Sequence, residues 1–285
     1  MTEYIKSPFN YIGGKYKLLP QIIPLFPKDI GTFYDLFGGG ANVSINVESK
    51  KVYYNDIVHY VSDVFSSLQK LTTDEALDKV KTVVSDYQLS RTNTEGFLQL
   101  REDYNNGLNS WEYFYTLVAH SFNDQFRFNN NHKYNSSFGR NKSDFNSRKE
   151  KNFIDFMSRL TEIDIEFDSK DFKEIDFSKI SGKDFVYCDP PYLISIGNYN
   201  DGKRGFNGWS EEDESDLHSV LDELNTRNVR FALSNVTHHQ GVENKQLIDW
   251  AKKYNTHELK SSYSNANYRK RNREELTREV LITNY

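Results

Sequence analysis

The segment 184–193, DFVYCDPPYL, ends an apolar run with a group of hydrogen-bond acceptors. Pro190 and Pro191 fix the backbone and remove two amide donors, so carbonyl groups are left to accept hydrogen bonds. Asp189 adds a carboxylate, and Tyr192 adds an aromatic face. An exocyclic amine on a base that has left its helix can donate two N–H groups and stack its ring, so these four residues complement it. Acceptors on both N–H groups oppose delocalisation of the nitrogen lone pair, which makes the amine a usable nucleophile.

A second candidate site follows the segment 33–44, FYDLFGGGANVS, where an apolar run ends in three glycines and is expected to resume as a helix. Glycines at the carboxyl end of a strand let a ligand approach the backbone closely. Val43 stands where the dinucleotide-binding fingerprint requires its third glycine. Asp56, after the next strand, is placed either to accept hydrogen bonds from a ribose diol or to cap the following helix. These features indicate a nucleoside cofactor without a pyrophosphate, so S-adenosylmethionine competes well with NAD.

The N-terminal segment 9–19, FNYIGGKYKLL, places Tyr11 and Lys15 before an apolar-periodic stretch that is expected to be a helix. A phosphate-binding P-loop needs a glycine where Phe9 stands and Ser or Thr where Tyr16 stands, so ATP binding is disfavoured. Lys15 is a candidate to neutralise a carboxylate of the cofactor. The alternative is a solvated lysine at the start of a helix.

Composition restricts the class of protein. The 285 residues are 37% hydrophobic and 15% aromatic, which is enough for a sizeable core and argues against a disordered chain or a small disulfide scaffold. One cysteine excludes an internal disulfide, and no apolar run approaches the length of a membrane span. We therefore expect a cytoplasmic protein without a membrane anchor. The seven histidines lack metal-ligand spacing, so no metal is expected.

The charge distribution favours a nucleic-acid partner, although the net charge of −5 alone does not. Residues 127–151 contain seven basic and two acidic side chains, and residues 260–278 contain six basic and two acidic ones. Both stretches also hold many Asn, Ser and aromatic residues, the types that contact phosphates, base edges and base faces. A single charge run is usually a solvated loop. Two such runs, in a chain that also carries the motifs described above, favour a nucleic-acid partner.

The elements that must position these sites alternate between strands and helices. Short apolar runs predict strands, and helical periodicity predicts helices, one of which opens at Ser210 with a capping box completed by Asp213. The alternation indicates the α/β class, with a Rossmann-like, doubly wound, mostly parallel sheet. Strands are expected at 32–37, 51–55, 164–167, 185–188, 229–234 and 279–283, and helices at 59–71, 74–89, 95–105, 111–123 and 210–225.

The spacing also predicts an insertion. From Asp35 to Asp189 the chain runs 154 residues, whereas three strand–helix units need only about 90. The surplus falls in a helical stretch followed by a polar, basic segment that continues to about Lys151. We therefore expect a discontinuous cofactor-binding and catalytic domain of residues 1–61 and 156–285. Residues 62–155 are expected to form an inserted, mainly helical domain with a basic, hairpin-like extension.

Together these motifs resemble the Dam family of DNA adenine-N6 methyltransferases, in particular its bacteriophage-encoded branch, over nearly the whole chain. The resemblance implies a class I methyltransferase that uses S-adenosylmethionine and grips its target adenine with Asp189, Pro190, Pro191 and Tyr192. It further implies a set of cofactor contacts from the N-terminal motif, the glycine strand, the carboxylates after the strands and a pair that brackets the cofactor adenine. These residues are Tyr11, Lys15, Asp35, Phe37, Gly38, Asp56, Asp171, Phe172 and Asp189.

The expected insertion resembles the target-recognition domain of the same family. In the segment 122–142, FNDQFRFNNNHKYNSSFGRNK, Arg127 matches a base-reading arginine and is the first candidate for a bidentate contact with guanine. Gln125 and Asn141 depart from the phage pattern, where these positions are apolar and basic, so a GATC recognition sequence rests on the resemblance alone. Further DNA contacts are expected from Asn129, Asn135, Arg140 and Lys142.

The reaction implied by the resemblance is transfer of a methyl group to N6 of an adenine that has rotated out of duplex DNA. We expect a monomer in solution, and the residues leave open whether two copies bind together on DNA as a dimer. One rival function is a cytosine-N4 methyltransferase, although such enzymes more often carry Ser in place of Asp189. A methyltransferase for RNA or protein glutamine would leave the basic insertion unexplained. A non-catalytic DNA-binding protein with a vestigial cofactor site is the third rival.

The segment after Tyr199, NDGKRGFNGW, is about five residues longer than in the phage relatives. It is expected to be either a lid over the extruded base or a length variant of a surface loop.

Overall fold

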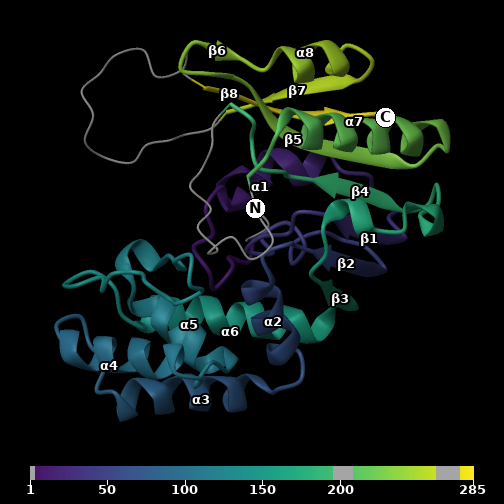
Figure 1. The fold of residues 1–285 in the computed structure, drawn as a ribbon. Coiled ribbons are helices and arrows are strands. Elements are labelled where there is room, and N and C mark those ends of the chain that lie inside the picture. The colour runs from purple at the N-terminus through teal and green to yellow at the C-terminus, as the bar shows by residue number, and fades with distance from the viewer. Residues whose placement is uncertain (1–3, 195–207, 261–276) are drawn as a thin grey trace.

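A mostly parallel sheet forms the centre of the molecule (Figure 1). The computed structural model describes residues 4–194, 208–260 and 277–285, and within them the strand order is β3-β2-β1-β4-β5-β8-β7, with β6 paired to β5. Strands β1 to β5 are parallel, and the pairs made by β6, β7 and β8 are antiparallel. The predicted doubly wound α/β fold is confirmed. The strands are β1 (Thr32–Asp35), β2 (Lys51–Asn55), β3 (Ile165–Asp168), β4 (Phe185–Cys188), β5 (Arg230–His239), β6 (Val242–Glu243), β7 (Asn255–Leu259) and β8 (Thr277–Thr283).

The strand order reverses between β1 and β4. The chain runs outward from β1 through β2 to β3, and then returns to the other side of β1 as β4 and β5. Open parallel sheets bind ligands at the carboxyl ends of their strands where such a reversal occurs. The residues with the strongest chemical signals lie at this point, because Asp35 ends β1 and Asp189 directly follows β4.

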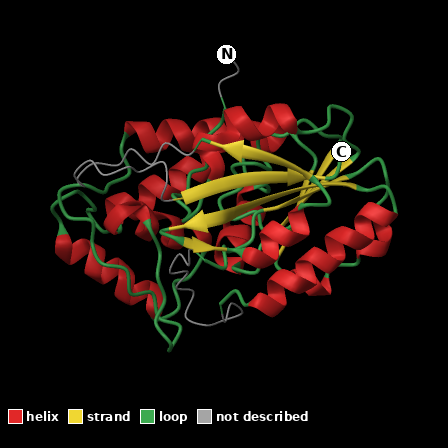
Figure 2. Ribbon diagram, turned by 90° about the horizontal axis from the view of Figure 1, so that it is seen from above, coloured by secondary structure: helices red, strands yellow, loops and turns green. Residues whose placement is uncertain are grey.

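Both faces of the sheet are covered, as strand β4 illustrates. All its residues are buried, and side chains alternate between the two faces of a strand. Phe185 and Tyr187 therefore enter a core shared with the N-terminal segment, whereas Val186 and Cys188 pack with helices α7 (Glu211–Thr226) and α8 (Lys245–Ala251). Seen from above, the strands lie between helices on both sides (Figure 2).

A group of helices lies below the sheet in the view of Figure 1. Side-chain caps define where these helices begin: Thr72 and Glu75 form a capping box, and Asn93 and Asn146 accept hydrogen bonds from the first turns that follow them. The expected domain boundaries, after residues 61 and 155, fall inside α2 and α6, so continuous helices join this group to the sheet. The helices are α2 (His59–Leu68), α3 (Thr73–Asp86), α4 (Thr94–Asn105), α5 (Trp111–His120) and α6 (Ser147–Glu162).

Between α5 and α6 the chain forms a short hairpin. A 3₁₀ turn, η3 (Phe122–Asp124), leads into it, and isolated antiparallel bridges join Ser121 to Phe138 and Phe128 to Tyr134. The Phe128 ring is buried and stacks on Tyr60 of α2, with 4.0 Å between the ring centroids. The hairpin is therefore anchored to the helices by apolar side chains, whereas Arg127 and Asn135 on it are exposed.

Of two helices predicted near the site, one forms in pieces and the other is wrong. After Gly14 the chain is helical to Leu25, but only as the short pieces η1 (Lys15–Leu18), α1 (Leu19–Ile22) and η2 (Ile23–Leu25), because Pro20 and Pro24 have no N–H to continue an α-helical ladder. After Gly40 the chain makes turns rather than a helix, with Ala41 in the left-handed region at φ +58° and isolated hydrogen bonds such as Ile45 N–H to Ala41 C=O. Both segments still reach the strand ends, because Lys15 lies 2.6 Å from Asp189 after β4 and Ser44 donates a hydrogen bond to Asp35 at the end of β1.

Candidate active site

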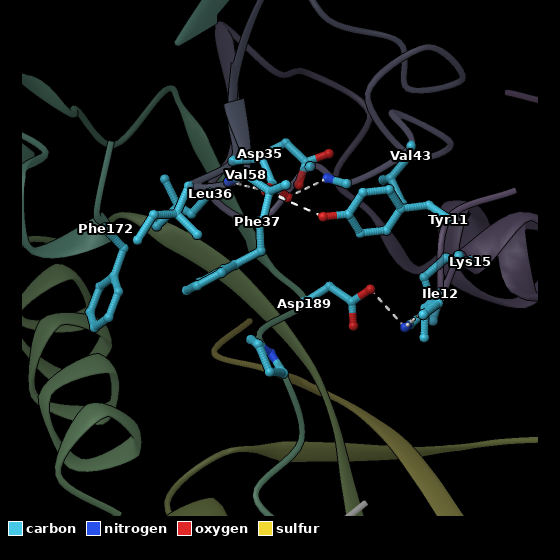
Figure 3. A pocket seen from close by; sticks show the side chains of 18 of the residues that line it. Tyr11, Ile12, Lys15, Asp35, Leu36, Phe37, Val43, Val58, Phe172 and Asp189 are labelled. Atoms are coloured by element: carbon cyan, nitrogen blue, oxygen red, sulfur yellow. Dashed lines mark hydrogen bonds and ion pairs between the residues drawn. The ribbon is translucent and has the colours of Figure 1, made fainter. Parts of the chain in front are cut away.

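A cavity opens at the carboxyl ends of β1 and β4. Figure 3 shows Tyr11, Lys15, Asp35, Phe37 and Asp189 arranged around it. Pro191, one of the four residues expected to hold the target base, also lines it. The cavity is lined by all nine of the residues expected to contact a cofactor, namely Tyr11, Lys15, Asp35, Phe37, Gly38, Asp56, Asp171, Phe172 and Asp189.

The glycine loop, residues 38–40, takes its shape from close contact with Tyr54 of β2. A Cβ atom on Gly38 would lie 2.2 Å from Cε2 of the Tyr54 ring. That ring is fully buried, and its hydroxyl donates to the Gly39 carbonyl at 2.6 Å. Gly39 adopts φ +49°, a left-handed conformation that glycine adopts without strain. The loop therefore leaves backbone, rather than side chains, facing the cavity.

We expect Gly38→Ala to lower the free energy of unfolding by about 1 to 3 kcal/mol, because the buried Tyr54 ring must move to admit the methyl group. Urea unfolding monitored by circular dichroism measures the loss. Tyr54→Leu removes the ring, so the combined variant should lose less than the sum of the two single losses. Strict additivity would show that the clash is not the cause.

Asp35 places a buried carboxylate at the base of the cavity. Its Oδ2 accepts a hydrogen bond from Ser44 Oγ at 2.5 Å. Its Oδ1 has no hydrogen-bond partner among the residues that the structure describes. Burial raises the pKa of Asp35 to about 7; the Ser44 hydrogen bond opposes the rise, and the nearby carboxylates of Asp189 and Asp56 add to it. A buried carboxylate oxygen without a partner is a natural acceptor for a donor or cation on a ligand.

Asp56 ties the glycine loop to the start of α2. Its Oδ2 accepts the Gly39 N–H at 2.8 Å, and its Oδ1 accepts the Val58 N–H at 2.8 Å and the Tyr11 hydroxyl at 3.5 Å. Burial raises the pKa of Asp56 to about 6 despite these hydrogen bonds. Asp56 accepts the N–H of Val58, the N-cap residue of α2, but α2 has no side-chain cap within the described residues, so the alternative role as a helix cap is wrong. Asp56 does line the cavity where the ribose contact is expected.

Asp189 and the residues after it, Pro190, Pro191 and Tyr192, form what we call the acceptor corner. The Lys15 ammonium lies 2.6 Å from Asp189 Oδ2, and the Tyr192 hydroxyl lies 3.0 Å from Oδ1. Burial raises the pKa of Asp189, and the Lys15 charge opposes that rise. Lys15 is itself only 5% exposed and lies 5.0 Å from the Tyr192 ring centroid, so it is not the solvated lysine of the alternative interpretation.

An aromatic wall closes another side of the cavity. The rings of Phe37 and Phe172 lie 5.6 Å apart, and Trp209 packs edge-on against Phe37 with 5.6 Å between centroids. Asp171 caps the 3₁₀ turn η4 (Phe172–Glu174) by accepting the Lys173 N–H. Trp209 donates its indole N–H to the buried carboxylate of Glu214 at 3.0 Å, which fixes its orientation. Such a wall suits the flat face of a heteroaromatic ring.

Two residues of this region are absent from the sequence-based set. Trp209 belongs to the segment interpreted as a lid or a length variant, although its position directly before the Ser210 capping box marks it as anchored. Glu279, on β8, is 3% exposed and lies 3.0 Å from the Tyr192 hydroxyl. Its sequence signal is an acid beside the apolar run VLI, because glutamate is seldom buried without a partner.

The residues expected to contact DNA lie on and after the hairpin rather than at the cavity. Arg127, Asn135, Arg140 and Lys142 are exposed. The Arg127 carbonyl accepts the Asn135 N–H at 2.9 Å, which places these two residues opposite each other. Asn129 has a structural contact, because its side chain accepts the N–H groups of two residues in the turn, Asn131 and Lys133.

Some predictions lie outside the described residues. Residues 200–207 of the longer segment after Tyr199 belong to this group, and so does most of the second basic stretch, residues 261–276. Within the described ranges, no group of three or more His, Cys, Asp or Glu side chains is placed to hold a metal ion. No helix among the same residues combines the length and apolar character needed to cross a membrane.

The sheet topology and the cavity at its reversal point define a class I methyltransferase fold, and comparison of the sequence identifies the family. Residues 11–265 match the model of the D12 class N6 adenine-specific DNA methyltransferases, so the chain belongs to this family. The resemblance to the Dam family that the motifs indicate is thereby confirmed. This family uses S-adenosylmethionine generally, which agrees with the cofactor class expected from the residues.

Individual relatives include methylases of restriction–modification systems. The chain is 48% identical over 284 residues to the type II methyltransferase M.FokI of Planomicrobium okeanokoites, and 45% identical over 285 residues to the modification methylase StsI of Streptococcus sanguinis. These alignments cover 100% and 99% of this chain but 43% of each relative, so the chain spans less than half their length. It is also 25% identical over 268 residues to the DNA adenine methylase of Escherichia coli strain K12, covering 92% of this chain and 91% of that protein.

Proposed function

We propose that this chain transfers a methyl group from S-adenosylmethionine to N6 of an adenine in duplex DNA. The observation that carries the proposal is that Asp189 and Pro191 of the acceptor corner line the same cavity as the glycine loop. An amine held by Asp189 would therefore face a cofactor held along the loop. Membership of a family specific for N6 of adenine favours adenine over cytosine N4.

The residues of the cavity fit the chemistry of S-adenosylmethionine. The backbone of the glycine loop is open to a ligand, and Asp35 presents a buried oxygen without a partner among the described residues. We assign the carboxylate of the cofactor to Lys15, its ribose to Asp56 and its adenine to Asp171 and Phe172. Tyr11, Asp35, Phe37 and Gly38 complete the cavity. When bound, the cofactor supplies a methyl group activated by a positively charged sulfur.

Cofactor affinity should rise about fivefold between pH 6 and pH 7. The pKa of Asp35 lies at about 7, so its side chain is mostly protonated and neutral at pH 6. A positively charged group of the cofactor beside Asp35 binds the ionised carboxylate more tightly, so the affinity rises as Asp35 ionises. Isothermal titration calorimetry with S-adenosylmethionine at the two pH values measures the change. Asp35→Asn keeps the hydrogen bond to Ser44 but cannot ionise, so it should flatten the dependence. An equal pH dependence of cofactor affinity in this variant would contradict a contact between Asp35 and a positively charged group of the cofactor.

The acceptor corner is proposed to hold an adenine that has rotated out of the duplex. The Tyr192 ring stacks on the base, and Asp189 and the Pro190 carbonyl accept its two N6 protons. Both acceptors stabilise the positive charge that develops on N6 as it is methylated. Asp189 does not need to remove a proton before the attack, because the methylated nitrogen is acidic enough to lose it afterwards. Holding N6 in line with the reactive methyl group provides much of the rate enhancement.

The hairpin is proposed to read the DNA sequence, with Arg127 as the first reader. Its backbone is held opposite Asn135, while its side chain is exposed and makes no ion pair with a described residue. A guanidinium in this position can reach O6 and N7 of a guanine in the major groove. Asn135, Arg140 and Lys142 are proposed to add phosphate and base contacts.

Arg127→Ala should cost about 1 to 3 kcal/mol of discrimination at one guanine of the recognition sequence. Methylation rates on duplexes that differ at one position each measure this discrimination. Lys142→Ala, at an exposed position beyond the hairpin, should instead weaken methylation of all duplexes equally, because a lysine contact to phosphate carries no sequence information. An unchanged sequence profile in Arg127→Ala would place the reader elsewhere.

The proposed function is tested by digesting methylated DNA to nucleosides and identifying the product by mass spectrometry. We expect N6-methyladenine, and N4-methylcytosine would replace the adenine assignment. Sequencing of DNA from a methylation-free host that expresses the chain then maps the modified positions. Methylation confined to GATC would support the sequence preference of the Dam resemblance, and another confined sequence would replace it. Absence of both methylation and cofactor binding would favour a DNA-binding protein with a vestigial site.

A further inference from the structure

Glu279 is a buried acid beside the acceptor corner, and the proposed function gives it no role. It lies on β8 opposite Val236 of β5 and Leu259 of β7, so strands on both sides fix its backbone. Its Oε1 lies 3.0 Å from the Tyr192 hydroxyl and 3.6 Å from Lys15 Nζ. Its Oε2 is buried and has no hydrogen-bond partner within the described ranges. Burying a carboxylate in this way is costly, which favours a use at the site.

The hydroxyl of Tyr192 has one proton but two carboxylates within reach. Asp189 Oδ1 and Glu279 Oε1 each lie 3.0 Å from the hydroxyl oxygen, and a hydroxyl donates only once. Asp189 Oδ2 is already engaged by Lys15 at 2.6 Å. If Tyr192 donated to Oδ1 as well, each oxygen of Asp189 would already hold one protein donor, and the target amine would have to share Oδ1 with the Tyr192 hydroxyl. If Tyr192 donates to Glu279, Oδ1 stays available for the amine of a target base.

We propose that Glu279 is a positioning residue that accepts the Tyr192 hydroxyl proton and thereby keeps Asp189 Oδ1 open to the substrate amine. The same hydrogen bond fixes the angle of the Tyr192 ring on which the base stacks. Glu279 itself does not touch the base. The inference rests on the proposed function, because it concerns the acceptor for the amine in that site. An acceptor held by two neighbouring strands is preorganised for this task.

The test is a set of single and combined variants assayed for methyl transfer to DNA. Glu279→Leu keeps the approximate volume and removes the acceptor, so kcat should fall about tenfold or more. The KM for S-adenosylmethionine should change by less than about threefold, because the cofactor contacts remain. Glu279→Gln keeps an acceptor oxygen and should recover most of the lost kcat. Glu258→Gln, at an exposed position on neighbouring β7, is the matched control and should leave kcat unchanged.

A double-mutant cycle distinguishes positioning from a general structural role. Tyr192→Phe removes the hydroxyl, so adding Glu279→Leu to it should cause no further loss in kcat. If Glu279→Leu does not fold, the cycle is run with Glu279→Gln, and any loss in that variant must likewise vanish in the Tyr192→Phe background.

Three outcomes would overturn the inference. The first is a kcat for Glu279→Leu equal to that of the unmodified chain, and the second is losses that multiply in the combined variant. The third is failure of Glu279→Gln to recover any activity. If the unmodified chain transfers no methyl group to DNA, the proposed function fails and the inference fails with it. If the unmodified chain is active and one of the three outcomes occurs, only the inference about Glu279 fails.

Discussion

Replacing Asp189 with alanine should lower the rate of methyl transfer about a thousandfold or more while DNA binding survives. The carboxylate lies at the end of β4, faces the cavity and is the charged acceptor of the corner. Without it the target amine loses a hydrogen-bond acceptor, and the positive charge that develops on nitrogen loses its nearest counter-charge. Single-turnover transfer of a radiolabelled methyl group measures the rate, and fluorescence anisotropy with a labelled duplex measures binding.

Two controls make the Asp189 result specific. Asp249→Ala removes an exposed carboxylate on α8 and should leave the rate unchanged. Asp189→Asn retains one acceptor oxygen, so its rate should lie between those of the alanine variant and the unmodified chain. A folded alanine variant whose rate is within about tenfold of the unmodified rate would contradict the role given to Asp189.

Replacing Lys15 with methionine should lower the free energy of unfolding by about 3 to 5 kcal/mol at neutral pH. Lys15 is a buried cation that lies between two carboxylates, at 2.6 Å from Asp189 and 3.6 Å from Glu279. Methionine fills much of the same space but leaves the buried carboxylates without their counter-charge. The same variant should bind S-adenosylmethionine more weakly, because Lys15 is assigned to the carboxylate of the cofactor.

The penalty for removing Lys15 should grow as pH rises. The Lys15 charge lowers the pKa of Asp189, so the variant raises that pKa further above its unfolded value. A carboxyl with a raised pKa stabilises the fold fully below its unfolded pKa, and this contribution is lost as pH rises through the folded pKa. Urea unfolding at pH 5 and pH 8 should therefore show the larger deficit at pH 8. Lys17→Met, at an exposed position two residues away, is the control, and a deficit independent of pH would contradict the account.

The sequence predicts the parts of the molecule that local physics determines. The run FVYC before Asp189 is apolar throughout because β4 is covered on both faces, and its short length marks a strand. Glycine and proline mark the two turns where β1 and β4 end, so both halves of the cavity can be located before the fold is known. The helix that opens at Ser210 is predicted by its capping box, which the structure contains.

The parts that the sequence does not predict depend on contacts between distant segments. β7 is mostly exposed and polar, so it lacks the alternation that predicts a strand and forms by pairing with β8. Glu279 reaches Tyr192 only through the placement of β8 next to β5, across 87 residues of chain. Trp209 becomes part of the cavity through its packing on Phe37 and its hydrogen bond to Glu214. None of these neighbours is encoded in local periodicity.

The central claim is that the acceptor corner holds the amino group of an extruded adenine against the methyl donor. A crystal structure of the chain with a duplex containing its target adenine and a non-transferable analogue of S-adenosylmethionine tests it most directly. We expect adenine N6 to lie about 3 Å from both Asp189 Oδ1 and the Pro190 carbonyl, with the analogue along the glycine loop. An adenine that remains stacked in the duplex, or an analogue bound away from the loop, would contradict the claim.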